Sequence, residues 1–180
     1  KKMRLIPLAL SICIMSCSYK VHTLQKPQVD FQSYDSWCWM NSCDPIYKGD
    51  AAYFNKEVID EIYNSIAFNM HDKGYTQGDE NSDLIVVFHL NVVQEEMEVA
   101  AQSSFEFGED YGNSSWIKDE YPEMIRYLKG NLVIDVIDSK TSEVIWKSSM
   151  VGYSDINNSP SKENIWKNVA RAMKKLPKKS

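Results

Sequence analysis

The sequence lacks an apolar run long enough to cross a bilayer. A spanning helix needs about 20 predominantly apolar residues, and the apolar stretch near the N-terminus, Leu5 to Met15, has only 11. Three basic residues precede this stretch, and a small residue followed by a cysteine, Ser16-Cys17, ends it. That order is typical of a secretory signal peptide, which is removed from the mature protein. We therefore predict that residues 1–16 are a cleaved signal peptide.

The segment around the predicted cut, Ile14-Met15-Ser16-Cys17, resembles the bacterial lipobox, in which the cysteine sulfur takes a diacylglycerol. The resemblance implies lipidation of Cys17, and two acyl chains anchor a protein stably without help from its surface. Ser18 follows the cysteine where aspartate would signal inner-membrane retention, and no acidic run follows. By similarity to lipoprotein sorting, we predict an envelope protein that is lipid-anchored to the outer membrane and faces the periplasm.

The mature chain also lacks the positive charge that nucleic-acid binding requires. Without the three basic residues of the leader it has 17 basic and 25 acidic side chains, a formal charge near −8, which excludes nucleic acid as a partner. In residues 162–180, by contrast, seven basic residues stand against one acid, Glu163. A helix with cations at its C-terminal end, followed by a solvated stub, explains this excess; contact with an anionic surface is the alternative.

Histidines are few, and none suggests chemistry. His22, His71 and His89 each lack a second ligand at metal spacing, so no zinc site is predicted. His89 has no activated serine or cysteine motif to serve, and we expect it to be an ordinary strand residue. The sequence thus predicts no cofactor, no metal and no enzyme activity.

Two groups of acidic residues have a spacing that could suit a functional site, the first a calcium loop and the second an acid–base pair. Asp79, Asn81 and Asp83 have the spacing of the first calcium-loop ligands, but Leu84 replaces the required glycine and Leu90 the bidentate glutamate, which excludes that site.

Asp135 and Asp138 could act as acid and base. However, they lie three residues apart on a predicted strand and would point to opposite faces. Asp138 better fits a turn.

Cysteines are also few, and two of them, Cys38 and Cys43, fall close together in the predicted domain. An exported compartment favours their pairing, so we predict a disulfide. Four residues separate them rather than the two usual in redox-active pairs, which argues against a catalytic role.

Apolar periodicity predicts six elements. Spacings of three and four indicate helices, and alternating or continuous branched runs indicate strands. The predicted order is strand 29–39, helix 55–72, strands 83–93, 132–138 and 144–153, and helix 159–177, with Asn55 and the Ser159-Pro160 pair at the helix starts. This order predicts an α+β domain over 29–177, with a single mostly antiparallel sheet and two helices on one face. Residues 17–28 would be a lipidated tether and 178–180 a basic tail.

Residues 94–124 mix acids with aromatics and fit either an insertion or a long hairpin. Long segments of this kind are often functional, so Phe105, Phe107, Tyr111 and Trp116 are candidate contact residues. Aromatics along the chain could also form a ligand groove or pack in the core: Trp37, Trp39, Tyr53, Trp116, Trp146 and Trp166.

Four blocks of the sequence carry a family likeness. They are Val29-Asp30-Phe31 with Tyr34 and Trp37, Gly74-Tyr75, Asp83-Leu84-Ile85-Val86, and above all Gly130-Asn131-Leu132-Val133-Ile134-Asp135 through Thr141 to Ile145-Trp146-Lys147. In these blocks the chain resembles a family of small Gram-negative lipoproteins known as domain of unknown function 4136. The likeness spans nearly the whole mature chain and implies a lipoprotein with an α+β domain. The family brings no established activity or catalytic residues. The cysteine pair and residues 94–124 depart from its pattern.

Three functions follow from these observations. The first is a non-catalytic binding or assembly module with an envelope protein partner. The second is a small-molecule or lipid-binding lipoprotein, with a pocket between helices and sheet that the aromatics line. The third is a carboxylate-dependent hydrolase, for which no pair of acids can be assigned. The oligomeric state is not predicted.

Overall fold

The computed structural model describes residues 20–40, 46–99 and 123–179. The predicted lipidation site Cys17 and the candidate contact residues lie outside these ranges. Within them the chain forms seven strands, two α-helices and two 3₁₀ turns: β1 (Val21–Gln25), η1 (Phe31–Ser33), β2 (Ser36–Trp39), β3 (Ile46–Gly49), η2 (Ala51–Tyr53), α1 (Lys56–Asp72), β4 (Thr76–Gln77), β5 (Leu84–Val99), β6 (Glu123–Asp138), β7 (Val144–Asp155) and α2 (Lys162–Met173).

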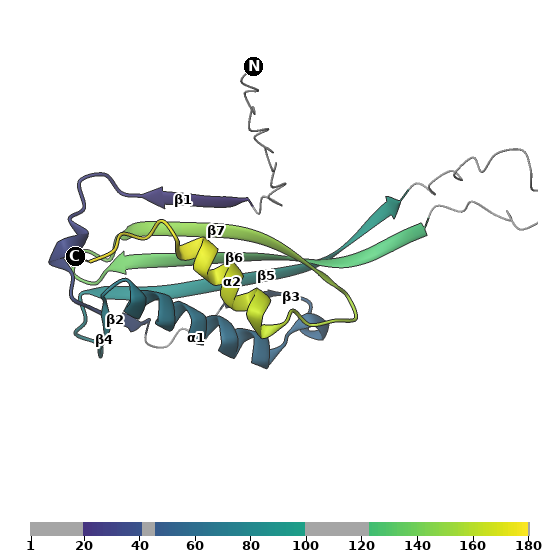
Figure 1. The fold of residues 1–180 in the computed structure, drawn as a ribbon, viewed down its shortest axis with the longest axis horizontal. Coiled ribbons are helices and arrows are strands. Elements are labelled where there is room, and N and C mark those ends of the chain that lie inside the picture. The colour runs from purple at the N-terminus through teal and green to yellow at the C-terminus, as the bar shows by residue number, and fades with distance from the viewer. Residues whose placement is uncertain (1–19, 41–45, 100–122, 180) are drawn as a thin grey trace, which may run out of the picture.

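The strands form one mixed sheet (Figure 1). Four neighbours, β1-β7-β6-β5, are antiparallel, whereas β2 and β3 both pair in parallel with β5, and β4 pairs in parallel with β2. The prediction of a mostly antiparallel sheet with six elements was therefore wrong in order and direction. The physical reason is that α1 lies between β3 and β5, and a helical crossover returns the chain parallel to the strand it left.

The predicted tether contains a strand that the sequence analysis missed. Residues 21–25 form β1, which pairs with β7 from Val21↔Met150 to Gln25↔Trp146. Its side chains are mostly exposed and polar, as expected of a short edge strand. The chain therefore joins the domain at Val21, and not at residue 29.

The first predicted strand, 29–39, is correct only in its second half. Asp30 caps the turn η1 by accepting a hydrogen bond from the Gln32 backbone N–H at 3.0 Å, which turns the chain before β2 begins. Phe31 is buried in the core. The aromatic residues that indicated a strand here serve packing instead.

Helix α1 confirms its prediction closely. Asn55 is the N-cap and accepts from the N–H groups of Glu57 and Val58 at 2.9 and 3.3 Å. Gly74 has a φ of 89°, the left-handed conformation that ends a helix at low steric cost.

Helix α2 begins later than predicted, because its N-cap is Ser161, which accepts from Asn164 N–H at 3.3 Å. Ser159, predicted as the cap, lies two residues earlier, and its hydroxyl oxygen accepts a hydrogen bond from Asn55 Nδ2 at 2.9 Å. Neither helix in the part of the chain that is described is long and apolar enough to span a bilayer.

The end of the basic C-terminal region is docked, and not a fully solvated stub. The Lys179 backbone N–H donates to Lys73 O at 2.8 Å, and the Lys179 side chain forms an ion pair with Asp35. Tyr75 donates from its hydroxyl to Pro177 O at 2.9 Å.

Residues 94–124, for which the sequence fits either an insertion or a long hairpin, begin and end in two antiparallel strands that pair with each other. Strand β5 continues to Val99 and pairs with β6 as far as Glu123. Charged partners across the ladder account for this extension: Glu95 accepts from Lys129 at 2.8 Å, and Glu96 from Arg126 at 2.8 Å. Residues 100–122, with Phe105, Phe107, Tyr111 and Trp116, lie outside the described ranges.

Both helices lie over one face of the sheet, and one hydrophobic core fills the space between them (Figure 1). Alternate residues of the central strands point into this core, while their neighbours, such as His89 and Lys147, face the other side. All residues of the core cluster fall between Phe31 and Leu176. The domain thus has its own hydrophobic core, as an independently folding unit does.

Candidate functional site

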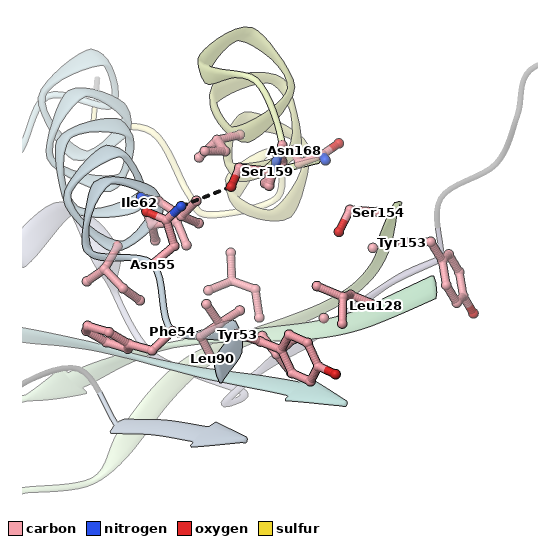
Figure 2. Close-up of a pocket in the computed structure, with 18 of the residues that line it drawn as sticks. Tyr53, Phe54, Asn55, Ile62, Leu90, Leu128, Tyr153, Ser154, Ser159 and Asn168 are labelled. Carbon is pink, nitrogen blue, oxygen red and sulfur yellow. Dashed lines mark hydrogen bonds between the residues drawn. The ribbon is translucent and has the colours of Figure 1, made fainter. Parts of the chain in front are cut away.

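The candidate site is a pocket between the two helices and the sheet, at the end of the helix layer where both helices begin. Its cavity volume is about 300 Å³. Its walls come from η2, the first turns of α1 and α2, the loop before α2, and the middle or end of β5, β6 and β7. Figure 2 shows the labelled side chains of these elements around the opening.

Glycines explain why the cavity exists. In the sheet, Gly49, Val92, Gly130 and Gly152 lie side by side on β3, β5, β6 and β7, a set we call the glycine row. Val92, Gly130 and Gly152 line the pocket. A Cβ placed on Gly152 would meet no atom within 4 Å, and one on Gly130 only Leu90 Cδ1 at 4.0 Å. The floor is therefore open because two side chains are missing from it.

The lining carries no charged side chain, although a quarter of the chain is charged. The inner wall is aliphatic and the outer wall adds amides, hydroxyls and aromatic rings. Aliphatic residues of the wall are Val58, Ile59, Ile62, Leu90, Val92, Leu128, Leu132, Ile156, Ile165 and Val169, joined by Met150. Such a lining favours an uncharged, apolar guest because burying an unpaired charge there would be costly.

A hydrogen bond joins the two helix starts at the mouth. Asn55, while capping α1 through its side-chain oxygen, donates from Nδ2 to Ser159 Oγ at 2.9 Å (Figure 2). Asn168 also lines the pocket from α2. The mouth is thus polar but uncharged, and one residue both starts a helix and ties it to the other.

Aromatic residues build the side of the pocket next to β3. The rings of Tyr47 and Phe54 meet edge to face with centroids 5.3 Å apart. Tyr53 donates from its hydroxyl to Gln94. Of the aromatics considered for a groove, Tyr53 lines the pocket.

The other candidate aromatics that the structure describes lie elsewhere. Trp37 and Trp146 are fully buried in the core, and Trp39 packs against it. Trp166 lies on the outer side of the helix pair, where it donates from Nε1 to Glu61 at 2.6 Å.

Several charged side chains lie in a second depression on the outer side of the pocket. Glu61 accepts from Trp166 and from Lys162 Nζ, the latter at 2.9 Å, and these hydrogen bonds hold the pKa of Glu61 below its ordinary value. Glu57 and Asp60 lie in the same outer depression. A charged part of a ligand would therefore remain outside the cavity.

Asp135 and Asp138, which the sequence analysis considered as an acid–base pair and rejected, lie on opposite faces of β6. Asp135 is buried on the far side of the sheet, 3.3 Å from Lys147 Nζ and 3.8 Å from His89 Nε2. Asp138 caps the turn after β6, as predicted, accepting from the N–H groups of Lys140 and Thr141 at 2.8 and 3.0 Å.

Asp138 also binds Tyr34. The Tyr34 hydroxyl donates to Asp138 at 2.7 Å; this bond, followed by the backbone N–H of Thr141, lowers the pKa of Asp138. Burial and Asp138 together raise the pKa of Tyr34 to about 12. Both shifts belong to a structural hydrogen bond that ties the turn to the segment before β2.

The calcium-like acids serve turns and strand ends. Asp83 accepts from the Asp35 and Ser36 backbone N–H groups at 2.9 and 3.1 Å, and Asp79 accepts from Asn81 N–H at 2.9 Å. Across residues 20–40, 46–99 and 123–179, no three acids, histidines or cysteines gather as metal ligands.

Cys38 is buried and carries a free thiol in the structure, so the predicted disulfide is not formed there. Burial raises the pKa of this thiol, although a hydrogen bond with Ser82 acts against the rise; a raised pKa keeps a thiol unreactive. Its predicted partner, Cys43, lies outside the described ranges.

Apart from Tyr53, the residues that line the pocket were not predicted from the sequence as ligand contacts. One signal could have found two of them. Gly130 and Gly152 both stand inside runs with strand pattern, and glycine within a strand often marks a close approach of a ligand or another backbone. That they lie opposite each other depends on the register of β6 and β7, which only the structure gives.

The fold has relatives among solved structures. PelC dodecamers from Paraburkholderia phytofirmans match with a TM-score of 0.51 in two crystal forms, at 10% and 9% identity, covering 91% of this chain and 100% of theirs. A PDZ domain protein from Parabacteroides distasonis matches with a TM-score of 0.51 at 15% identity, covering 88% of this chain and 35% of that one. At such identities the likeness shows the fold alone.

Sequence comparison defines the family. No curated protein matches the chain in sequence. A family model matches residues 21–178, which contain every helix and strand described above. The chain therefore belongs to the family described as domain of unknown function (DUF4136).

Proposed function

We propose that this protein is a lipid-anchored, non-catalytic binding module of the cell envelope that holds an uncharged apolar or amphipathic small molecule in the pocket between α1, α2 and the sheet. The observation that carries the proposal is the charge-free cavity of about 300 Å³ above the glycine row. Small-molecule sites are typically apolar concavities of this size or larger with a few polar groups at fixed places. No carboxylate lines the cavity, so we do not propose a hydrolase.

The anchoring half of the proposal rests on the lipobox resemblance at Cys17. Replacing Cys17 with serine should abolish both cleavage before residue 17 and recovery of the protein in the membrane fraction. A Cys17→Ser product that is still cut at the same bond and still membrane-bound would contradict the anchor.

The binding half is tested with a neutral apolar dye, N-phenyl-1-naphthylamine, whose fluorescence rises in apolar sites. The mature chain with Cys17→Ser, which lacks the lipid but keeps the whole core, should bind the dye saturably. Gly152→Leu places a side chain in the open space of the floor, where a Cβ meets nothing within 4 Å. We expect it to weaken binding at least tenfold.

Val151→Leu is the matched control. Val151 is the neighbour of Gly152 in β7 and points to the opposite face of the sheet, because side chains alternate along a strand. Because this side chain faces away from the pocket, the dye affinity of Val151→Leu should stay within about twofold of the affinity of the parent. Equal affinity in the parent and in Gly152→Leu would contradict the pocket as the site.

An assembly role is the second candidate, and one observation favours it. Beyond the Tyr127↔Asp155 pair β6 loses its partner β7, and residues 96–99 and 123–126 continue as a two-stranded ribbon (Figure 1). An isolated ribbon is marginally stable in water, and exposed Met97 adds apolar surface to it. The PelC structures of similar fold are dodecamers. Light scattering that finds only monomers of the lipidated protein would remove this candidate.

A further inference from the structure

The position of β1 decides how far the domain can stand from its anchor. β1 is held along its whole length by pairing with β7, and the Lys26 backbone N–H donates to Ile145 O at 2.8 Å just beyond it. Val21 packs against the core. The tether after Cys17 therefore comprises residues 18–20, and not the 11 residues 18–28 that the sequence suggested.

The direction of β1 decides which end of the domain the anchor holds. Val21 lies opposite Met150, which lines the pocket, whereas Gln25 lies opposite Trp146 near the filled end of the core. In Figure 1, β1 begins toward the same end of the molecule as the N-terminal ends of α1 and α2. The chain from the anchor thus enters the domain beside the pocket.

The reach of this short tether is small. Four residue steps separate Cys17 from Val21, and a fully extended chain spans at most about 3.5 Å per residue. The Cα of Val21 thus stays within about 14 Å of the Cα of Cys17. A lipid on Cys17 lies in the bilayer, so this distance keeps the pocket end close to the membrane surface.

We infer that the ligand of the pocket is an acyl chain of a phospholipid drawn from the membrane that anchors the protein, with the headgroup left outside. This inference rests on the proposed function and names its ligand. The charge-free wall fits a hydrocarbon chain, and charged side chains such as Glu61 and Lys162 line the neighbouring depression and not the cavity. A chain already held at the surface of a membrane meets acyl chains at high effective concentration.

The test uses the full lipidated protein reconstituted in vesicles that contain a phospholipid with a diazirine in one acyl chain. After irradiation, mass spectrometry maps the labelled residues. We expect labelling at pocket residues such as Leu90, Leu132 and Val169. Gly152→Leu should lose at least nine-tenths of it, and Gly130→Leu serves as a second filling variant if the first folds poorly. Val151→Leu should be labelled like the parent.

A second variant tests the role of the tether. Inserting 15 Gly/Ser residues after Ser18 leaves the domain and the anchor unchanged but lets the pocket move away from the surface. Because effective concentration falls with tether length, we expect pocket labelling to fall at least threefold. Labelling that stays equal with the longer tether would overturn the inference that the short tether presents the pocket to the membrane.

The inference and the proposed function fail in different ways. Suppose that the soluble mature chain binds the neutral dye but the pocket of the lipidated protein is not labelled in vesicles. That result would overturn the membrane phospholipid as the ligand and would leave the binding function standing. The same result would follow if the acyl chains on Cys17 itself filled the pocket. Absence of dye binding overturns the binding function, and pocket labelling lost in Gly152→Leu supports the inference.

Discussion

The two ends of the helix–sheet layer share the strands β5, β6 and β7 and differ in the side chains that these strands carry. At one end Trp39, Val86, Val136 and Trp146 lie side by side on β2, β5, β6 and β7, a set we call the tryptophan row. About 20 Å along the strands, at the rise of a β-strand, lies the glycine row. The first row fills its layer, with Trp146 fully buried, and the second leaves a cavity.

The difference teaches that the pocket is a consequence of side-chain size and not of a gap between elements. The backbones of β5, β6 and β7 run continuously through both rows. Close packing of interiors means that missing side chains are felt directly as space. Aromatic contacts strengthen the filled end, where the Trp39 and Tyr63 rings meet at 4.7 Å and the Tyr63 and Phe88 rings at 4.8 Å.

Emptying the tryptophan row should have the largest effect. Trp146→Ala removes a fully buried ring, and such truncations cost about 3–5 kcal/mol because they lose buried area and leave a cavity. Urea unfolding at pH 7 measures the change. Ser149→Ala, three residues along on the other face, should stay within about 0.5 kcal/mol; a similar loss in both variants would contradict the comparison.

Replacing glycine by alanine should change the free energy of unfolding in opposite directions at the two edges of the glycine row. A Cβ on Gly49 would lie 2.4 Å from Val92 O, so Gly49→Ala should destabilise the protein by about 1–3 kcal/mol. Gly152→Ala meets no neighbour and should stabilise it by about 0.5 kcal/mol by restricting the unfolded chain. Chemical denaturation of both variants checks this. Destabilisation by Gly152→Ala would mean that the floor is already filled.

Two variants of Asn55 can distinguish its role as the N-cap of α1 from its hydrogen bond to Ser159 at the pocket mouth. Asn55→Ala loses both roles and should cost about 1 kcal/mol in unfolding free energy. Asn55→Asp keeps the capping oxygen but cannot donate to Ser159. It should keep most of the stability yet change dye affinity. If both variants bind the dye like the parent, the Asn55–Ser159 bond does not shape the site.

The smallest expected effect is the pH-dependent contribution of Asp138, at the filled end of the layer, to the free energy of unfolding. The folded-state pKa of Asp138 is lowered, so its contribution to stability is present above the ordinary aspartate pKa, about 3.9, and is lost as pH falls through the lower folded value. Asp138→Asn should thus be less stable than the parent at pH 7, by about 1 kcal/mol or less given its partial exposure.

The difference in unfolding free energy between Asp138→Asn and the parent should be smaller at pH 2–3 than at pH 7. Urea unfolding at pH 7 and in acid measures this difference. Tyr34→Phe removes the first cause of the shift and should reproduce part of the effect. A gap that is unchanged in acid would show that Asp138 acts through packing and not through its charge.

Much of the fold was predictable where the signal is local. The stripe of Ile59, Ile62, Ile66 and Met70 predicted α1 with its cap at Asn55, and these side chains are buried as expected. The branched run after Asp83 and the hairpin of β6 and β7 were also found, although their ends were not. Strand ends depended on cross-strand partners such as Lys129 for Glu95, which no local pattern reveals.

The sequence suggested a pocket between helices and sheet as one alternative, but local patterns could not predict which residues would line it. Its parts come from η2, three strands, a loop and two helices. Gly130 and Gly152 looked like interruptions of strand pattern until the register placed one opposite the other. The contact surface expected at 105–116 lies outside the described ranges and stays a prediction.

By itself the sequence determined the two helices, the cores of the long strands and the family, because helix periodicity, strand alternation and motif blocks are properties of neighbouring residues. Only the tertiary structure decided that polar residues 21–25 form an edge strand, that β2 and β3 run parallel to β5, and that glycines from three strands share one row. Each of these depends on a partner far away in the chain, since strand pairing and register are set by contacts between segments and not by the pattern within one.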